Sequence, residues 1–94
     1  MPKLFYSPAA KEDIRDAALY IARDNIPASQ RWVLGVKNKC RLLAKYPEMG
    51  ERRNDLGDGI RLSSYQNYGI YFQRTERGVE VVRVIRGDRN TQSL

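Results

Sequence analysis

The stretch from Val79 to Arg86, VEVVRVIR, is the most β-branched run in the chain and predicts a strand inside a sheet. Upstream of it, alternation with a period of two predicts two further strands, at residues 60–65 and 68–74. Gln66-Asn67 and residues 75–78 separate these runs and are typical of turns. The last third of the chain is therefore expected to form a three-stranded antiparallel meander.

Two amphipathic helices are predicted before this meander. Ser7-Pro8 is typical of a helix start, because serine can cap a helix and proline fits its first turn. Apolar residues then recur with helical spacing to about Arg23. A second helix is expected from Pro27 or Ala28 to Tyr46, and its short connection to the first predicts an antiparallel helix hairpin.

The order of elements predicts the fold class. Residues Lys3–Tyr6 are consistent with a short N-terminal strand, and residues 47–59, which include three glycines, are expected to form an exposed loop. The resulting order, β-α-α-β-β-β, indicates an α+β fold with a helix hairpin on one face of an antiparallel sheet. With 94 residues, we expect a single domain over residues 1–94.

The side-chain inventory excludes several kinds of chemistry. The chain has no histidine and one cysteine, Cys40, which excludes histidine-dependent catalysis, an internal disulfide and a multi-cysteine zinc site. No run approaches the ~20 apolar residues of a membrane span, and the N-terminus lacks the pattern of a signal peptide. We expect a cytoplasmic protein that needs neither cofactor nor metal and does not contact a membrane.

Positive charge is concentrated in the second predicted helix. The chain carries 17 Lys and Arg against 11 Asp and Glu, a net charge of +6. Between residues 25 and 47 every charged residue is basic, namely Arg31, Lys37, Lys39, Arg41 and Lys45. Such a stretch suits an anionic partner, either nucleic acid or an acidic protein segment. The alternative is that these side chains only solvate a helix surface.

The sheet face away from the helices is a second candidate surface. Alternation is expected to direct four apolar residues toward the helices: Ile60, Leu62, Ile70 and Phe72. The opposite face then carries Arg61 and Tyr71, joined by Arg83, as an arginine–tyrosine surface. A solvated sheet face with aromatic cross-strand pairs is the alternative.

Three residues inside the second predicted helix have structural interpretations. Cys40 has the spacing of a core residue and is given no redox role. Gly35 costs about 1 kcal/mol relative to alanine in a helix and is expected to allow close approach of the two helices. Trp32 can belong to the core or face a partner, and the pattern leaves both open.

Six segments along the chain form a specific succession: LFYSPAA (4–10), DIRDAALYIARDN (13–25), LLAKYPEMG (42–50), GIRL (59–62), YGIYFQR (68–74) and VEVVRVIRGDR (79–89). In this order they resemble the ParE branch of the RelE/ParE superfamily of toxins from bacterial toxin–antitoxin pairs. The resemblance implies two helices on a mainly antiparallel sheet, in agreement with the order derived above. It also implies neutralisation by a cognate ParD-like antitoxin that wraps the toxin.

The superfamily divides by activity, and the residues present favour one branch. RelE-like members are metal-independent, ribosome-dependent mRNA endonucleases, whereas ParE-like members are described as poisons of DNA gyrase. The resemblance places arginines of the nuclease branch at Arg61 and Arg89, but Gly69 stands where that branch has another arginine, and its C-terminal tyrosine is missing. Two arginines without an acid–base partner hold an anion but transfer no proton well.

The resemblance therefore implies a non-enzymatic toxin that binds gyrase. Ribosome-dependent mRNA cleavage, or a non-toxic binding module of the same fold, are the alternatives. No catalytic residue is assigned, and direct sequence-specific nucleic-acid binding is not expected. The candidates for target contact are Arg61, Tyr71, Arg83, Arg86 and Arg89. The candidates for antitoxin contact are Arg31, Lys37, Lys39, Arg41 and Lys45.

Overall fold

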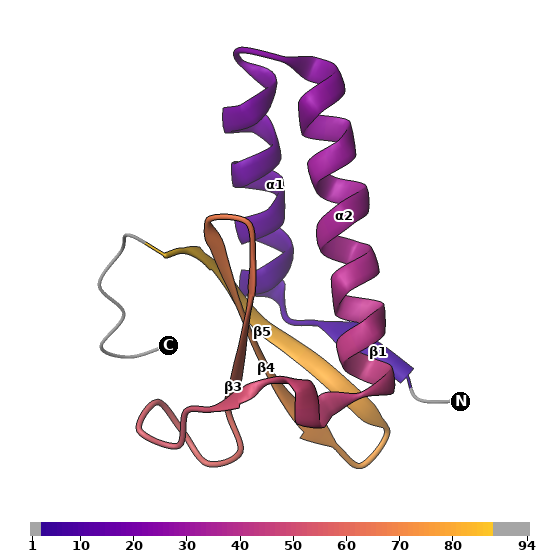
Figure 1. The fold of residues 1–94 in the computed structure, drawn as a ribbon, viewed down its shortest axis with the longest axis vertical. Coiled ribbons are helices and arrows are strands. Elements are labelled where there is room, and N and C mark those ends of the chain that lie inside the picture. The colour runs from indigo at the N-terminus through magenta and orange to yellow at the C-terminus, as the bar shows by residue number, and fades with distance from the viewer. Residues whose placement is uncertain (1–2, 88–94) are drawn as a thin grey trace.

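Figure 1 shows the computed structural model of the protein, which describes residues 3–87. Its elements are β1 (Lys3–Tyr6), α1 (Pro8–Ala22), α2 (Ile26–Lys45), the short 3-10 helix η1 (Pro47–Met49), β2 (Glu51–Arg52), β3 (Arg61–Tyr65), β4 (Tyr68–Thr75) and β5 (Gly78–Arg86). The helices form a hairpin that packs on one side of the sheet. This arrangement confirms the predicted α+β class, while η1 and β2 add regular structure to a segment predicted as loop.

The five strands form one mixed sheet in the order β1-β5-β4-β3-β2. The last three strands are antiparallel neighbours, as the meander predicts. Strand β1 departs from the expected antiparallel sheet, because it pairs parallel to β5, with Lys3 opposite Gly78 and Tyr6 opposite Val81. The most β-branched run therefore lies inside the sheet, between the first strand of the chain and β4.

Side-chain caps fix where both helices begin. The Ser7 hydroxyl accepts a hydrogen bond from the Ala10 N–H at 2.9 Å and donates one to the Val82 carbonyl of β5 at 2.7 Å. It thus closes the start of α1 and ties it to the sheet. Helix α2 begins at Ile26, one residue before the predicted start, because the Asn25 side chain caps its first turn.

The core lies between the helix hairpin and the inner face of the sheet. The helices contribute Ala10, Ile14, Trp32, Val36, Cys40 and Leu43, and the strands contribute Ile70, Phe72, Val79, Val81 and Val84. Cys40 is fully buried, which confirms the prediction of a core position. Within residues 3–87, no helix is long and apolar enough to cross a bilayer.

Strand β3 shows the opposite alternation to the one predicted. Arg61 lies directly opposite Phe72, and Leu62 lies opposite Tyr71. Because opposed residues of an antiparallel pair point to the same face, Arg61 shares the helix side with Phe72 and Leu62 lies on the outer side. Leu62 is accommodated there by Gly69, since its Cδ1 atom lies 2.9 Å from where a Cβ of Gly69 would stand.

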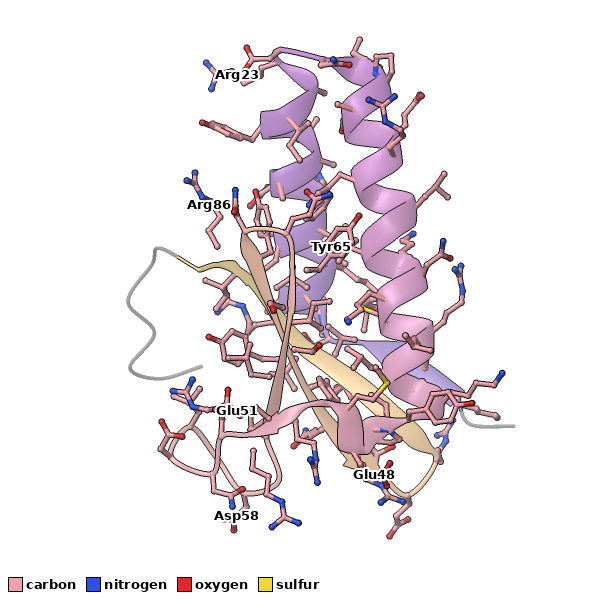
Figure 2. All side chains as sticks on the ribbon, in the orientation of Figure 1. Arg23, Glu48, Glu51, Asp58, Tyr65 and Arg86 are labelled. Carbon is pink, nitrogen blue, oxygen red and sulfur yellow. The ribbon has the colours of Figure 1, made fainter. Side chains whose placement is uncertain are left out.

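The space beside Gly35 is occupied by a strand residue rather than by the other helix. A Cβ on Gly35 would lie 1.7 Å from the Tyr65 hydroxyl oxygen at the end of β3. Figure 2 shows Tyr65 between β3 and helix α2. The glycine expected to bring the helices together therefore makes room for Tyr65 against α2.

The buried Cys40 thiol and the half-buried Tyr6 hydroxyl make the stability of the fold fall at alkaline pH. Burial raises the pKa of the Cys40 thiol to about 11 and raises the pKa of the Tyr6 hydroxyl above its ordinary value. Below pH 9 the Cys40 thiol is protonated in both folded and unfolded chains, so it adds no pH dependence. Above that pH the unfolded chain loses this proton while the folded chain retains it, and stability falls as pH rises toward 11.

We expect the free energy of unfolding to be flat from about pH 7 to 8.5 and to drop at higher pH, with Cys40 contributing about 2 kcal/mol of the drop by pH 11. Urea titrations at a series of pH values measure it. Cys40→Ala is the matched variant, since it removes the thiol together with the part of the raised Tyr6 pKa that Cys40 causes. We expect this variant to be less stable at neutral pH, but its free energy of unfolding should fall less steeply as pH rises. Equal slopes for the two proteins would contradict the assignment to Cys40.

Candidate functional site

The predicted arginine–tyrosine surface does not form, because its members lie on different faces of the sheet. Arg61 is on the helix side, where its Nη1 donates a hydrogen bond to the Gly50 carbonyl at 2.8 Å. Tyr71 is on the outer side and is only 7% exposed. The reversed alternation of β3 is the cause, since it turns Arg61 away from Tyr71.

Arg83, the third member of that predicted surface, joins the sheet to helix α1. Its Nε and Nη2 atoms donate to the two carboxylate oxygens of Asp13 at 2.7 and 3.0 Å. The same carboxylate accepts the Val84 backbone N–H at 2.9 Å. Hydrogen bonding to Asp13 also raises the pKa of Arg83. These contacts give Arg83 a structural role, and we call the three bonds the Asp13 clip.

Arg86, another candidate for contact with the target, lies beside the helix hairpin. Its guanidinium carbon lies 6.0 Å from the centre of the Tyr20 ring, within the range of a cation–π contact. Figure 2 shows Arg86 at the end of β5, next to α1. Tyr20 itself is 57% exposed, so its ring and Arg86 form part of the surface. The remaining candidate, Arg89, lies outside the described residues.

A cleft of about 580 Å³ opens between the helix hairpin and the turn that joins β3 to β4. Its walls are rich in aromatic and basic side chains, including Tyr20, Arg31, Trp32, Tyr65, Tyr68 and Arg86. We call it the aromatic cleft. A smaller hollow of about 310 Å³ adjoins it, shares Tyr20, Tyr68 and Arg86, and extends toward Asp13 and Asp16.

Three aromatic rings form the floor of the aromatic cleft. The Trp32 ring centre lies 4.9 Å from that of Tyr68 and 6.4 Å from that of Tyr65, both at tilted angles of 59° and 58°. Both pairs have centroid separations in the range at which aromatic rings attract each other. Trp32 is 3% exposed and yet lines the cleft. This confirms the core position for Trp32, which also lines the cleft, while contact with a partner stays a prediction.

The basic residues of α2 do not share one face. With ~100° of rotation per residue, Arg31, Arg41 and Lys45 project on the same side, whereas Lys37 and Lys39 lie on opposite flanks of the helix. Leu34 stands among the first group and is 63% exposed. We call the group of Arg31, Leu34, Arg41 and Lys45 the α2 outer face. It combines positive charge with apolar surface.

Sequence reasoning missed the aromatic cleft, although one signal was present. Tyr65 and Tyr68 flank the predicted two-residue turn and lie directly opposite each other across β3 and β4. Tyrosines at both ends of so short a turn must share a face, which already places two rings together. Their contact with Trp32 depends on how the helices cross the sheet, and the pattern of residues does not contain that information.

Comparisons with known proteins bear on the whole chain. A sequence model of the family described as "ParE toxin of type II toxin-antitoxin system, parDE" matches residues 4–91. Among solved structures, a chain of the "Chromosomal ParDE TA system from P. aeruginosa" superposes with a TM-score of 0.76 at 16% identity, over 92% of this chain and 96% of that chain. No curated protein gives a significant sequence match. At this identity the structural likeness shows a shared fold.

Proposed function

Because this chain belongs to the ParE toxin family of type II toxin–antitoxin systems, we propose that it inhibits growth by binding DNA gyrase and that a cognate ParD-like antitoxin neutralises it. The family match over residues 4–91 is the observation that carries this proposal, and the fold shared with a ParDE system chain supports it. Both interactions would take place in the cytoplasm, where gyrase acts on DNA.

The positions of the arginines support action by binding rather than by cleavage of RNA. Arg61 donates to the Gly50 carbonyl on the helix side of the sheet, whereas Arg83 lies opposite Tyr71 and is held by Asp13. The two guanidinium groups therefore serve separate structural contacts. A nuclease needs converging groups that stabilise the phosphorane and move a proton, and the sequence has no histidine to do so.

The surface of helix α2 supports an acidic protein partner. Its outer face carries Arg31, Arg41 and Lys45 around the exposed Leu34, on a chain with a net charge of +6. An acidic segment that folds on binding can match such a surface with carboxylates and apolar side chains together. These residues are our candidates for the first contact with the antitoxin.

Supercoiling by purified gyrase tests the proposed target. We expect the protein to reduce conversion of relaxed plasmid to the supercoiled form and to increase cleaved DNA trapped with gyrase. Addition of the cognate ParD-like antitoxin should restore supercoiling. Unchanged supercoiling with no trapped cleavage would contradict gyrase as the target. Codon-positioned cuts in translated mRNA, mapped by primer extension, would favour the nuclease alternative. Normal growth when the protein is expressed without its antitoxin would favour a non-toxic binding module.

Charge reversal on the α2 outer face should slow association with the antitoxin. For the double variant Arg41→Glu/Lys45→Glu we expect the association rate constant at low salt to fall about tenfold, because steering by local charge is lost. Its dependence on ionic strength should also weaken. Stopped-flow or biolayer measurements over a range of salt concentrations provide the test.

The matched control is Lys37→Glu/Lys39→Glu, which makes the same change in net charge on the two flanks of the same helix. It should reduce the association rate less than Arg41→Glu/Lys45→Glu does. If both pairs slow association equally, then only net charge matters and the α2 outer face is not the first contact. If neither pair changes the rate, the antitoxin approaches from another side.

A further inference from the structure

Three arginines line one hollow at the corner of the sheet that contains β2. The hollow has a volume of about 270 Å³ and is lined by Arg52, Asn54, Gly59, Ile60, Arg61 and Arg74. Strand pairing explains why the arginines meet there, because Arg52 lies opposite Arg61, and Arg61 lies opposite Phe72. Arg74 follows Phe72 by two residues, so all three arginines lie on the same face of the sheet. We call this hollow the arginine pocket.

The three guanidinium groups have few partners in the protein. Arg74 meets Glu48 at 3.7 Å, but the two side chains are 69% and 70% exposed, and such surface pairs are weak. Arg61 donates to the Gly50 carbonyl from Nη1, one of the nitrogens that together carry its five N–H groups. Among residues 3–87, no hydrogen bond or ion pair holds Arg52. The pocket therefore concentrates positive charge together with unused donors.

The nearest acidic residue in the sequence is engaged elsewhere. Both carboxylate oxygens of Asp55 accept hydrogen bonds from Arg53, each at 3.0 Å, and no aspartate or glutamate of the described chain lines the pocket. The Asn54 Oδ1 accepts the Gly59 N–H at 3.3 Å, which leaves the Asn54 amide N–H groups able to donate. Like charges gathered without a counter-charge repel one another, and an anionic ligand would relieve that repulsion.

The side chains of the pocket favour a phosphate group within a duplex. Guanidinium groups match phosphate oxygens in pairs, and a phosphate offers more acceptor oxygens than a carboxylate to three arginines. No aromatic ring lines the pocket, so it has no surface on which an exposed base could stack. A duplex presents its phosphates outward and keeps its bases stacked inside, which fits a site that has donors and no rings.

We propose that the arginine pocket binds the phosphate backbone of double-stranded DNA without regard to sequence. This deepens the proposed function, because a toxin bound to gyrase lies beside the duplex that the enzyme holds. The pocket would then add a contact with DNA to the contact with the protein. The guanidinium groups stay protonated, so they hold the phosphate and transfer no proton.

The arginine pair Arg52→Ala/Arg74→Ala tests the pocket directly. Both side chains are exposed and share only one weak ion pair, so the variant should fold. Fluorescence anisotropy with a short labelled duplex of mixed sequence, at a series of salt concentrations and without gyrase, measures the affinity. We expect the variant to bind about tenfold more weakly at low salt, and the slope of log affinity against log salt to lose about two in magnitude.

The matched control is Arg15→Ala/Arg23→Ala, which removes the same charge from exposed positions on α1 and its C-cap. Figure 2 shows Arg23 at the tip of the helix hairpin, at the opposite end of the molecule from Asp58 in the segment before β3. This control should change the affinity by less than about threefold and keep the wild-type salt slope. Equal weakening by the two variants would mean that only net charge matters, and it would overturn the assignment to the pocket.

The remaining outcomes separate this inference from the proposed function. A wild-type protein that does not bind the duplex at low salt would overturn the inference, while the supercoiling assay decides gyrase inhibition independently. Duplex binding that depends on Arg52 and Arg74, without inhibition of gyrase, would leave the phosphate site standing and refute the proposed target. Binding of pyrophosphate or poly-glutamate in calorimetry, with no binding of the duplex, would show a small-anion or acidic-protein site instead. Preference for an RNA duplex over the DNA duplex would overturn the assignment to DNA.

Discussion

Asp13→Ala should lower the free energy of unfolding by about 3 kcal/mol and the Tm by about 10–20 °C. The carboxylate accepts two hydrogen bonds from Arg83 and one from the Val84 backbone N–H. Removing it leaves a part-buried guanidinium and a backbone donor without their acceptor. The loss is smaller than for a fully buried ion pair, because a third of the Arg83 side chain is exposed. Thermal and urea unfolding followed by circular dichroism measure it.

Two further variants make the Asp13 result specific. Asp16→Ala removes the same group from an exposed position on the same helix and should change stability by less than about 0.5 kcal/mol. Asp13→Asn keeps an oxygen that can accept from Val84 but loses the charge opposite Arg83, so its stability should lie between wild type and Asp13→Ala. If Asp13→Ala is no less stable than Asp16→Ala, then the Asp13 clip does not hold α1 to β5.

Gly78→Ala is the second variant with a large expected effect. Gly78 has a φ of +149°, and a Cβ there would lie 2.0 Å from the Lys3 carbonyl oxygen and 2.6 Å from the Lys3 nitrogen. These atoms belong to the backbone of β1, so a side-chain rotation cannot relieve the clash. We expect a loss of about 3 kcal/mol, with weaker protection of the β1 amides in hydrogen exchange.

Gly59→Ala serves as its control. Gly59 also has a positive φ, +78°, but no heavy atom lies within 4 Å of where its Cβ would stand. This variant should therefore lose only about 1 kcal/mol, the cost of holding alanine in a left-handed conformation. The difference between the two variants isolates the contact between β1 and β5. Equal losses would mean that backbone strain alone accounts for the Gly78 effect.

The elements that the sequence predicted well are those with strong local signals. Ser7 with the following proline fixed the start of α1, and the alternation in β4 and β5 matched the observed strands. The end of α1 and the start of α2 moved by a residue because caps such as Asn25 act over the first turn. Such local signals determine where an element lies but not which neighbour it meets.

Strand β3 was misread because apolar residues were assumed to face the helices. Ile60 is buried but precedes the strand, and its Cγ1 atom packs 3.2 Å from the position of a Cβ on Gly57. Leu62 is covered on the outer face, above Gly69 and beside Tyr71. When both faces of a strand are covered, alternation no longer identifies the inner one. Pairing with β4 across the two-residue turn decides it, because Tyr65 opposite Tyr68 places Arg61 opposite Phe72.

The candidate site was only partly predictable, because several of its contacts join residues that are far apart in the sequence. Net positive charge and the basic run of α2 were visible in the sequence, and they still support an acidic partner. The roles of Arg61 and Arg83 were not visible, because their acceptors, the Gly50 carbonyl and Asp13, are brought close only by the fold. The aromatic cleft was equally hidden, since the contact of Trp32 with Tyr65 and Tyr68 depends on how the helices pack on the sheet.

The parallel pairing of β1 with β5 has a consequence for how the protein is made. Contacts from the start of α1 reinforce this link between the two ends of the described chain: Ser7 and Val82 are 75 positions apart in the sequence, and Asp13 and Arg83 are 70 positions apart. The first strand leaves the ribosome long before β5, its neighbour in the described sheet, has been translated. A nascent chain stalled before codon 78 lacks both the Asp13 clip and the Arg86 side of the cleft. The finished fold, and any toxicity that depends on it, can arise only after β5 has been translated.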